Sequence, residues 1–264
     1  MPNKLRQHDP FADARQLISH ARDQIGEAER LIAVFLDKQR GTFMVKVDPK
    51  TGQDVYSMRI TGPSLSSKIS KVTIDAAGNL RDALDRAVYG AAVAINGGAP
   101  KHTGFPFARD AAKVQKALNG KRLSGNPSEI RALLASFDPH EGGNDLLWAL
   151  SQVGNPITRR FIVPVGWTTF SGAVVGQSTF RYNRGRASSN EIVYMRMATG
   201  SRDDHQVPAK MGVAFEGIKA IAGKDVVGTL TGMAYQVERI VGVIEAETTK
   251  LTRRALKDRL GFQK

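Results

Sequence analysis

Apolar residues recur at steps of three and four positions along three long segments of the chain, and polar residues fill the positions between them. This spacing places the apolar residues on one face of a helix. The three segments run from about 9 to 38, from about 66 to 95 and from 226 to about 259. We therefore expect three long amphipathic helices, one N-terminal, one central and one C-terminal.

Alternating patterns predict strands in two regions. Phe43, Val45 and Val47 alternate with their neighbours, DPKTGQ supplies a turn, and an extended pattern resumes at 55–60, which indicates a β-hairpin. Four later stretches separated by turn residues predict an antiparallel sheet, and they read FIVPVG, FSGAVVGQSTFRY, NEIVYMRM and QVPAKMGVAF.

Three shorter helices are expected between the central helix and the sheet. One covers 108–118, one begins at a cap on Ser128, and one begins at a cap on Asn144.

The central helix itself is rich in small residues, which allow another helix to approach closely. These are Ala83, Ala87, Gly90, Ala91, Ala92 and Ala94. We expect the first and last helices to be its packing partners.

Helices and strands are segregated along the chain, and this order favours the α+β class over alternating βαβ units. Long amphipathic helices then pack together with an antiparallel β-sheet. No repeat or low-complexity linker divides the chain, so we predict a single α+β domain over 1–264. Its helical layer covers about 9–156 and 225–259, and its sheet covers about 157–216.

Composition predicts a folded, soluble, cytoplasmic protein. A chain of 264 residues with 41% hydrophobic content is long and apolar enough to bury a core. Cysteine is absent, which removes disulfides and thiol chemistry and agrees with a reducing compartment. The N-terminus lacks the apolar segment of an export signal. In the central helix, the run AVYGAAVAI is far shorter than the roughly 20 residues that cross a bilayer, so we expect no membrane span.

Positive charge is the most unusual feature of the composition. The formal net charge is +13, and residues 101–200 hold 13 basic against 6 acidic residues. Such an excess favours encounters with nucleic acid or another polyanion. Arginines and an aromatic ring gather around a predicted hairpin tip in FRYNRGRASSN, and two more arginines adjoin the same sheet. A nucleic-acid-binding surface would use Arg159, Arg160, Arg181, Tyr182, Arg184 and Arg186. For FRYNRGRASSN we favour the simpler interpretation, a solvated turn, and keep the nucleic-acid surface as the alternative.

The central helix contains arginines that resemble a site. In NLRDALDRAVYGAA, Arg81 lies four residues before Asp85, and Asp82 lies four residues before Arg86. Pairs at this spacing form weak ion pairs on a helix surface. We therefore favour a structural role for these four residues.

The order of motifs along the chain is distinctive. NLRDALDRAVYGAA is followed by TGFPF, LLASFDPHEGGNDLLWALSQVGN, NEI and VAFE. This order resembles a group of uncharacterised bacterial proteins, in which the helix reads NLRxALDH and precedes an FP motif and a segment like QPYxxxxxLWxLxxLxNxDKHR. The resemblance covers nearly the whole chain but implies no activity. Where the group carries His after ALD, this chain has Arg86, and PITRR at 156–160 replaces DKHR.

A divergent ribonuclease is a further alternative. HEPN-type ribonucleases are helical domains whose signature is Arg, four to six residues, and then His. In the central helix Arg86 occupies the place of that histidine, and arginine does not exchange protons near neutral pH. Arg15 and His20 match the signature literally. A match of this kind is expected by chance in a chain with this many arginines and histidines. We expect such a nuclease to be inactive.

Other motifs predict loops and turns. GIKAIAGKD at 217–225 departs from a phosphate-binding loop, and Asp203-Asp204-His205 and Asp138-Pro139-His140-Glu141 lack paired histidines at metal-ligand spacing. We predict no metal, no cofactor and no catalytic residue. The leading hypothesis is a non-enzymatic binding or interaction protein that self-associates or binds a partner through its helices.

Overall fold

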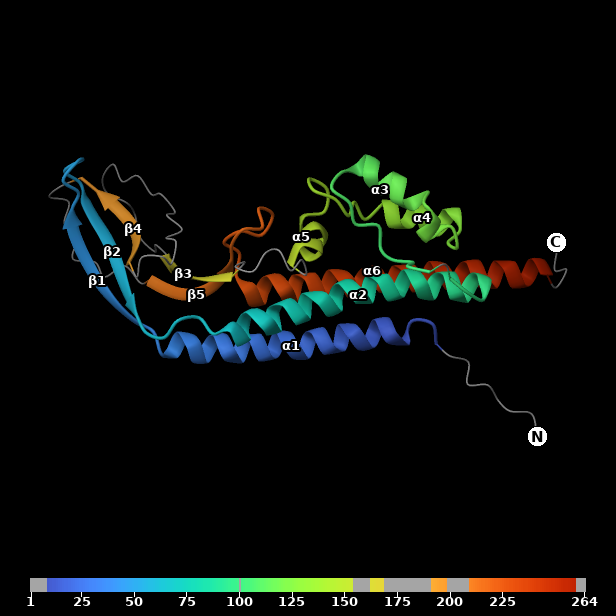
Figure 1. Ribbon diagram of the computed structural model, residues 1–264, viewed down its shortest axis with the longest axis horizontal. Helices are drawn as coiled ribbons and strands as arrows, with labels where there is room; N and C mark the ends of the chain where they lie inside the picture. The colour runs from blue at the N-terminus through green and yellow to red at the C-terminus, as the bar shows by residue number, and fades with distance from the viewer. Residues whose placement is uncertain (1–8, 100, 154–161, 169–190, 199–208, 260–264) are drawn as a thin grey trace, which may run out of the picture. The chain divides into compact units, whose positions relative to one another are not determined.

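A computed structural model describes residues 9–99, 101–153, 162–168, 191–198 and 209–259 (Figure 1). The α+β class is confirmed, and the long helices and the hairpin lie close to their predicted bounds. In chain order the elements are α1 (Ala12–Asp37), β1 (Arg40–Val47), β2 (Asp54–Thr61), α2 (Ser67–Asn96), α3 (Ala111–Leu118), the 3-10 helix η1 (Lys121–Leu123), α4 (Ser128–Ala135), α5 (Asp145–Val153), β3 (Ile162–Thr168), β4 (Glu191–Met197), β5 (Ala209–Phe215) and α6 (Val226–Arg259).

The chain divides into two compact units. The helical unit comprises 1–26, 72–159 and 228–264, and the sheet unit comprises 27–71 and 160–227. A single domain over the whole chain stays a prediction. Within the described ranges, no helix is both long and apolar enough to cross a membrane.

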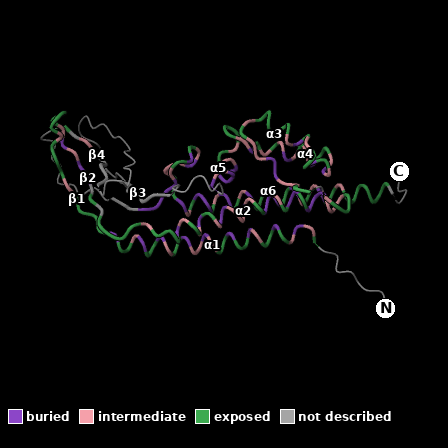
Figure 2. Tube along the Cα trace, in the orientation of Figure 1, coloured by how far each residue is buried: buried purple, intermediate pink, exposed green. Residues whose placement is uncertain are grey.

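The core of the helical unit is formed by the apolar faces of α1, α2 and α6 (Figure 2). Its fully buried side chains include Ala14, Leu80, Leu84, Val88, Leu230, Val237 and Ile240. Polar contacts join α1 to both other helices. Asn79 donates to Gln24 at 2.8 Å, and Arg22 of α1 forms a 2.6 Å salt bridge with Glu238 of α6. Gly90 of α2 lies so close to the backbone of Pro10 that a side chain there would clash.

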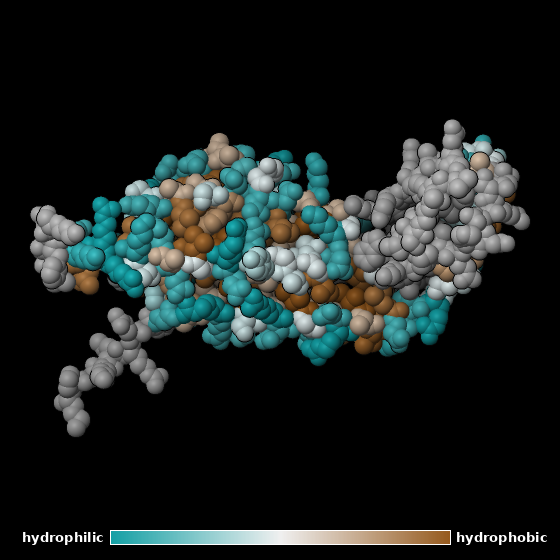
Figure 3. Space-filling view, turned by 180° about the vertical axis from the view of Figure 1, so that it is seen from behind, coloured by the Kyte–Doolittle hydropathy of each residue, from teal (hydrophilic) through white to brown (hydrophobic). Residues whose placement is uncertain are grey.

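Apolar side chains are also visible on the surface, between hydrophilic ones (Figure 3). On the helices of the helical unit the exposed large apolar residues are Ile74, Tyr89, Tyr235, Val243 and Leu256. Isolated exposed apolar residues are normal on protein surfaces.

The short helices begin at caps that the sequence predicted only in part. Asn144 Oδ1 accepts a hydrogen bond from the Leu147 N–H at 3.2 Å, which confirms the cap of α5. The predicted cap of α4 is wrong, because Pro127 occupies the cap position and Ser128 is the first helical residue. Pro127 is extended, with φ −66° and ψ 166°, a conformation that suits a residue just outside a helix.

The described residues of the sheet unit form two antiparallel sheets where the sequence suggested one. β1 and β2 form the predicted hairpin, and β4 pairs with β2, so the hairpin belongs to a three-stranded sheet. β3 pairs separately with β5, from Ile162 opposite Phe215 to Thr168 opposite Ala209. Local patterns locate strands, but pairing between distant strands is set by tertiary packing. This explains why the hairpin could not be assigned to its sheet from the sequence.

Candidate functional site

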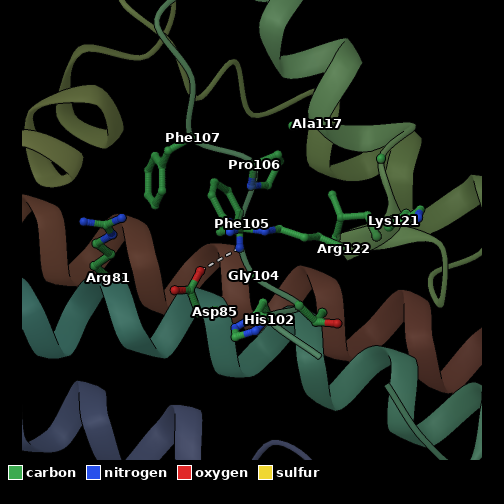
Figure 4. Close-up of a pocket in the computed structure, with 13 residues that line it drawn as sticks. Arg81, Asp85, His102, Gly104, Phe105, Pro106, Phe107, Ala117, Lys121 and Arg122 are labelled. Atoms are coloured by element: carbon green, nitrogen blue, oxygen red, sulfur yellow. Dashed lines mark hydrogen bonds between the residues drawn. The ribbon is translucent and has the colours of Figure 1, made fainter. Parts of the chain in front are cut away.

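A cavity of about 500 Å³ lies in the helical unit, and we call it the α2 pocket (Figure 4). Three segments line it. Arg81 and Asp85 come from α2, residues 102–107 form the loop after α2, and residues from 117 to 123 belong to the end of α3 and to η1. The volume falls within the range of about 300–1,000 Å³ that is typical of small-molecule sites.

The loop is held over α2 by one apolar anchor and one hydrogen bond. Phe105 is 6% exposed and stacks on Phe137, with ring centroids 6.3 Å apart. Its N–H donates to Asp85 Oδ1 at 2.6 Å. Gly104 makes this approach possible, because a Cβ atom there would lie only 2.9 Å from Asp85 Oδ1. The carboxyl group of Asp85 therefore ties the loop to the helix.

A tight connection between α3 and η1 presents two cations at the pocket. Leu118 and Leu123 are 3% and 1% exposed and anchor the two sides of this connection in the core. Lys121 and Arg122 lie between them and are exposed. In Figure 4 Arg122 extends from η1 toward Phe105 and the middle of the pocket.

The polar lining carries more positive than negative charge. Arg81, Lys121 and Arg122 are cations, and Asp85 is the single carboxylate of the lining. Burial raises the pKa of Asp85 above its ordinary value, although the Phe105 N–H and the charges of Arg81 and Arg122 act in the opposite direction. Within the described part of the chain, none of the three cations has a carboxylate at salt-bridge distance.

Aromatic rings form the apolar wall of the pocket. Phe105 and Phe107 are tilted by 51° with centroids 4.9 Å apart. The guanidinium carbon of Arg81 lies 5.9 Å from the centroid of the Phe107 ring, which is a cation–π distance. Phe107 is only half-buried, and Pro106 is buried beside it. The pocket therefore offers an apolar surface next to unpaired guanidinium groups, an arrangement suited to an anion that carries an apolar part.

The sequence predicted that the arginines of the central helix form ion pairs on the helix surface, and the structure places Arg81 differently. Arg81 lines the pocket, whereas Arg86 is exposed and is not part of the lining. The predicted ion pair between Arg81 and Asp85 is wrong, because Asp85 is turned to the Phe105 N–H and Arg81 lies over Phe107. The N–H of the buried Phe105 needs a partner more than the guanidinium group of Arg81 does, because Arg81 is only half-buried.

Several predicted residues lie outside the described residues. These are Arg159, Arg160, Arg181, Tyr182, Arg184 and Arg186, the predicted nucleic-acid surface, together with Asp203, Asp204 and His205. Among the described motifs, 217–225 is confirmed as a loop before α6. The segment 138–141 lies in the turn before α5, where the Asp138 carbonyl accepts from the Asn144 N–H at 2.8 Å.

The literal ribonuclease signature falls on α1. Arg15 forms a 2.9 Å salt bridge with Glu245 and a second one with Asp9. His20 is exposed. The guanidinium group of Arg15 is thus occupied by two carboxylates and does not line the α2 pocket.

Sequence patterns did not reveal the second cationic side of the pocket. His102 lies in a loop and Lys121 and Arg122 lie in the short helix η1. All three are exposed, and neither segment contains a motif of known chemistry. A weak signal was present, because TGFPF and GKR combine glycine with aromatic or basic residues. Only the folded chain brings these two segments beside Arg81.

Comparisons with protein-family models, with curated proteins and with solved structures gave no match. The resemblance to the bacterial group with the NLRxALDH helix therefore stays a prediction.

Proposed function

We propose that this protein is a non-enzymatic binding protein whose α2 pocket holds a small anionic ligand. The observation that carries the proposal is the set of cations at a concave, partly aromatic surface, which have no carboxylate at salt-bridge distance among the described residues. Arg81 approaches the pocket from α2, and Lys121 and Arg122 approach it from η1. Guanidinium groups bind carboxylates and phosphates through paired hydrogen bonds.

The residue types favour holding a ligand over transforming it. Arg81 and Arg122 keep their charge at all physiological pH values, so they attract an anion but transfer no proton. Asp85 already accepts the Phe105 N–H and fixes the loop. Arginines that keep their charge, next to a loop held in place by a hydrogen bond, are expected in a binding site.

Binding of pyrophosphate, followed by isothermal titration calorimetry at low ionic strength, tests this proposal. Because charge-assisted hydrogen bonds contribute about 1.5–3 kcal/mol each, we expect Arg81→Gln and Arg122→Gln each to weaken binding by roughly tenfold or more. Arg86→Gln is the matched control, since Arg86 lies on the same helix, is exposed and does not line the pocket. Its affinity should stay close to that of the unchanged protein. Equal losses in all three variants, or no binding at all, would contradict the proposal.

A second candidate function is nucleic-acid binding, and charge is the observation that favours it. Residues 101–200 hold 13 basic against 6 acidic residues, and Lys121 and Arg122 of the pocket belong to this range. Lys113 and Lys116 of α3 are also exposed. Such a surface would contact phosphates without reading a base sequence.

We expect a labelled single-stranded RNA to bind at 50 mM salt and to be released by 200 mM salt. Release of counterions makes phosphate contacts steeply dependent on salt, with losses of roughly 10³–10⁵ in affinity for 6–10 contacts. Fluorescence anisotropy measures both conditions. Absence of a signal at the lower salt concentration would remove this candidate.

The predicted cytoplasmic location and self-association stay predictions.

A further inference from the structure

We propose that the ligand of the α2 pocket is a nucleotide whose base carries an exocyclic amino group. This inference rests on the proposed function and names its ligand class. It follows from three parts of the lining, which match the phosphate, the flat ring and the amino group of such a molecule.

The cations match the phosphate. Arg81, Lys121 and Arg122 face a single carboxylate, so the lining has an excess of positive charge that a dianion neutralises better than a monoanion. Arg122 and Lys121 are exposed on η1, where they reach a phosphate without the need to bury it. Phosphate oxygens also suit the planar fork of a guanidinium group.

The aromatic wall matches the flat ring. Phe107 is half-buried and has Phe105 tilted against it at a centroid distance of 4.9 Å. Arg81 lies over the same ring, so a guanidinium group and an aromatic ring are next to each other. Bases stack on both kinds of surface. An inorganic anion would leave this apolar wall exposed to water.

Asp85 matches the amino group. Its Oδ1 accepts the Phe105 N–H at 2.6 Å, and within the described residues Oδ2 accepts no hydrogen bond. A carboxylate has about four acceptor sites, so Asp85 keeps acceptor capacity for a further donor. Burial raises the pKa of Asp85, which reflects the partial loss of hydration of its carboxyl group. An exocyclic N–H donated by a base would fill one of these acceptor sites.

A ligand that lacks the phosphate, the flat ring or the amino group leaves the cations, the aromatic wall or Asp85 without a matching contact. A sugar phosphate has no ring for Phe107, and an aromatic carboxylate has no donor for Asp85. The cavity of about 500 Å³ is large enough for a drug-sized molecule. A nucleotide uses the cations, the ring wall and the carboxylate together.

Calorimetric titrations with adenosine 5′-monophosphate, adenosine and ribose 5-phosphate test the assignment. Because stacking of one base contributes on the scale of a tenfold or larger change in affinity, we expect adenosine 5′-monophosphate to bind roughly tenfold or more tightly than ribose 5-phosphate. Adenosine should bind more weakly than the monophosphate, since it has no charge for Arg81 and Arg122. A four-residue oligoadenylate identifies the source of the nucleotide. Tighter binding of the oligomer indicates a single strand, weaker binding indicates a free nucleotide, and both results support the nucleotide class.

Asp85→Asn tests the amino-group contact. Uridine 5′-monophosphate lacks an exocyclic amino group, so we expect the unchanged protein to prefer adenosine 5′-monophosphate by several-fold or more. In Asp85→Asn the amide oxygen still accepts the Phe105 N–H, and the preference for the adenine base should be lost. Asp82→Asn is the matched control, because Asp82 is exposed on the same helix and should keep the preference.

The outcomes separate the two proposals. If ribose 5-phosphate binds as tightly as adenosine 5′-monophosphate, the nucleotide assignment is overturned while the anion-binding function stands. If neither these phosphates nor pyrophosphate binds, both proposals are overturned. If Asp85→Asn keeps the preference for adenine over uracil, the role assigned to Asp85 is wrong.

Discussion

Leu84→Ala is expected to lower the free energy of unfolding of the helical unit by about 2–5 kcal/mol, which is the usual cost of truncating a fully buried leucine. Leu84 has no exposed surface and lies on α2 between Arg81 and Asp85, on the opposite side of the helix from solvent. Neighbours in a close-packed core fill the resulting cavity only in part. The loss should appear as an earlier denaturant transition in the circular dichroism of the helices.

Tyr89→Ala serves as the control for Leu84. Tyr89 lies on the same helix and is 42% exposed, so it gives up much less buried surface. We expect the free energy of unfolding of Tyr89→Ala to stay within about 1 kcal/mol of that of the unchanged protein. Similar losses in both variants would show that the face of α2 has been assigned incorrectly, and the position of Arg81 and Asp85 in the pocket would then also be wrong.

Gly104→Ala is expected to weaken anion binding by roughly tenfold or more and to cost about 1–3 kcal/mol of stability. A Cβ atom at this position would lie 2.9 Å from Asp85 Oδ1 and 3.2 Å from its Cγ. The carboxyl group must move, and the Phe105 N–H then loses its acceptor. Because this hydrogen bond holds the loop over α2, its loss alters the wall of the pocket.

Gly98→Ala is the matched control for Gly104. Gly98 lies in the same segment between α2 and α3, and a Cβ atom there meets nothing within 4 Å. Stability and pyrophosphate affinity should both stay close to their original values. Denaturant unfolding and calorimetry measure the two quantities on the same preparations. If Gly104→Ala behaves like Gly98→Ala, the hydrogen bond from Phe105 to Asp85 does not shape the pocket.

Local patterns in the sequence predicted most of the elements. α6 begins at Val226 as expected, and Asn144 caps α5, because periodicity and capping depend on residues close together in the chain. The buried face of α2 was predicted correctly for the same reason. Strand pairing was not, since the partner of β2 in the three-stranded sheet is the distant β4.

The candidate site could be predicted only in part. Arg81 attracted attention within its helix, but Asp85, four residues further along the chain, suggested an ion pair at helical spacing. The structure instead gives Asp85 to the Phe105 N–H. Lys121 and Arg122 belong to a three-residue 3-10 helix, and no periodic pattern connects them to α2. Their approach depends on the apolar anchors Leu118 and Leu123, whose burial is a property of the folded chain.

Amide chemical-shift mapping during a pyrophosphate titration tests whether the α2 pocket binds an anion. We expect the largest shifts on 81–85, 102–107 and 117–123, and smaller shifts at these positions in Arg81→Gln. Shifts concentrated elsewhere, such as on the exposed basic residues at the end of α6, or the same shifts in Arg81→Gln as in the unchanged protein, would contradict anion binding at the α2 pocket.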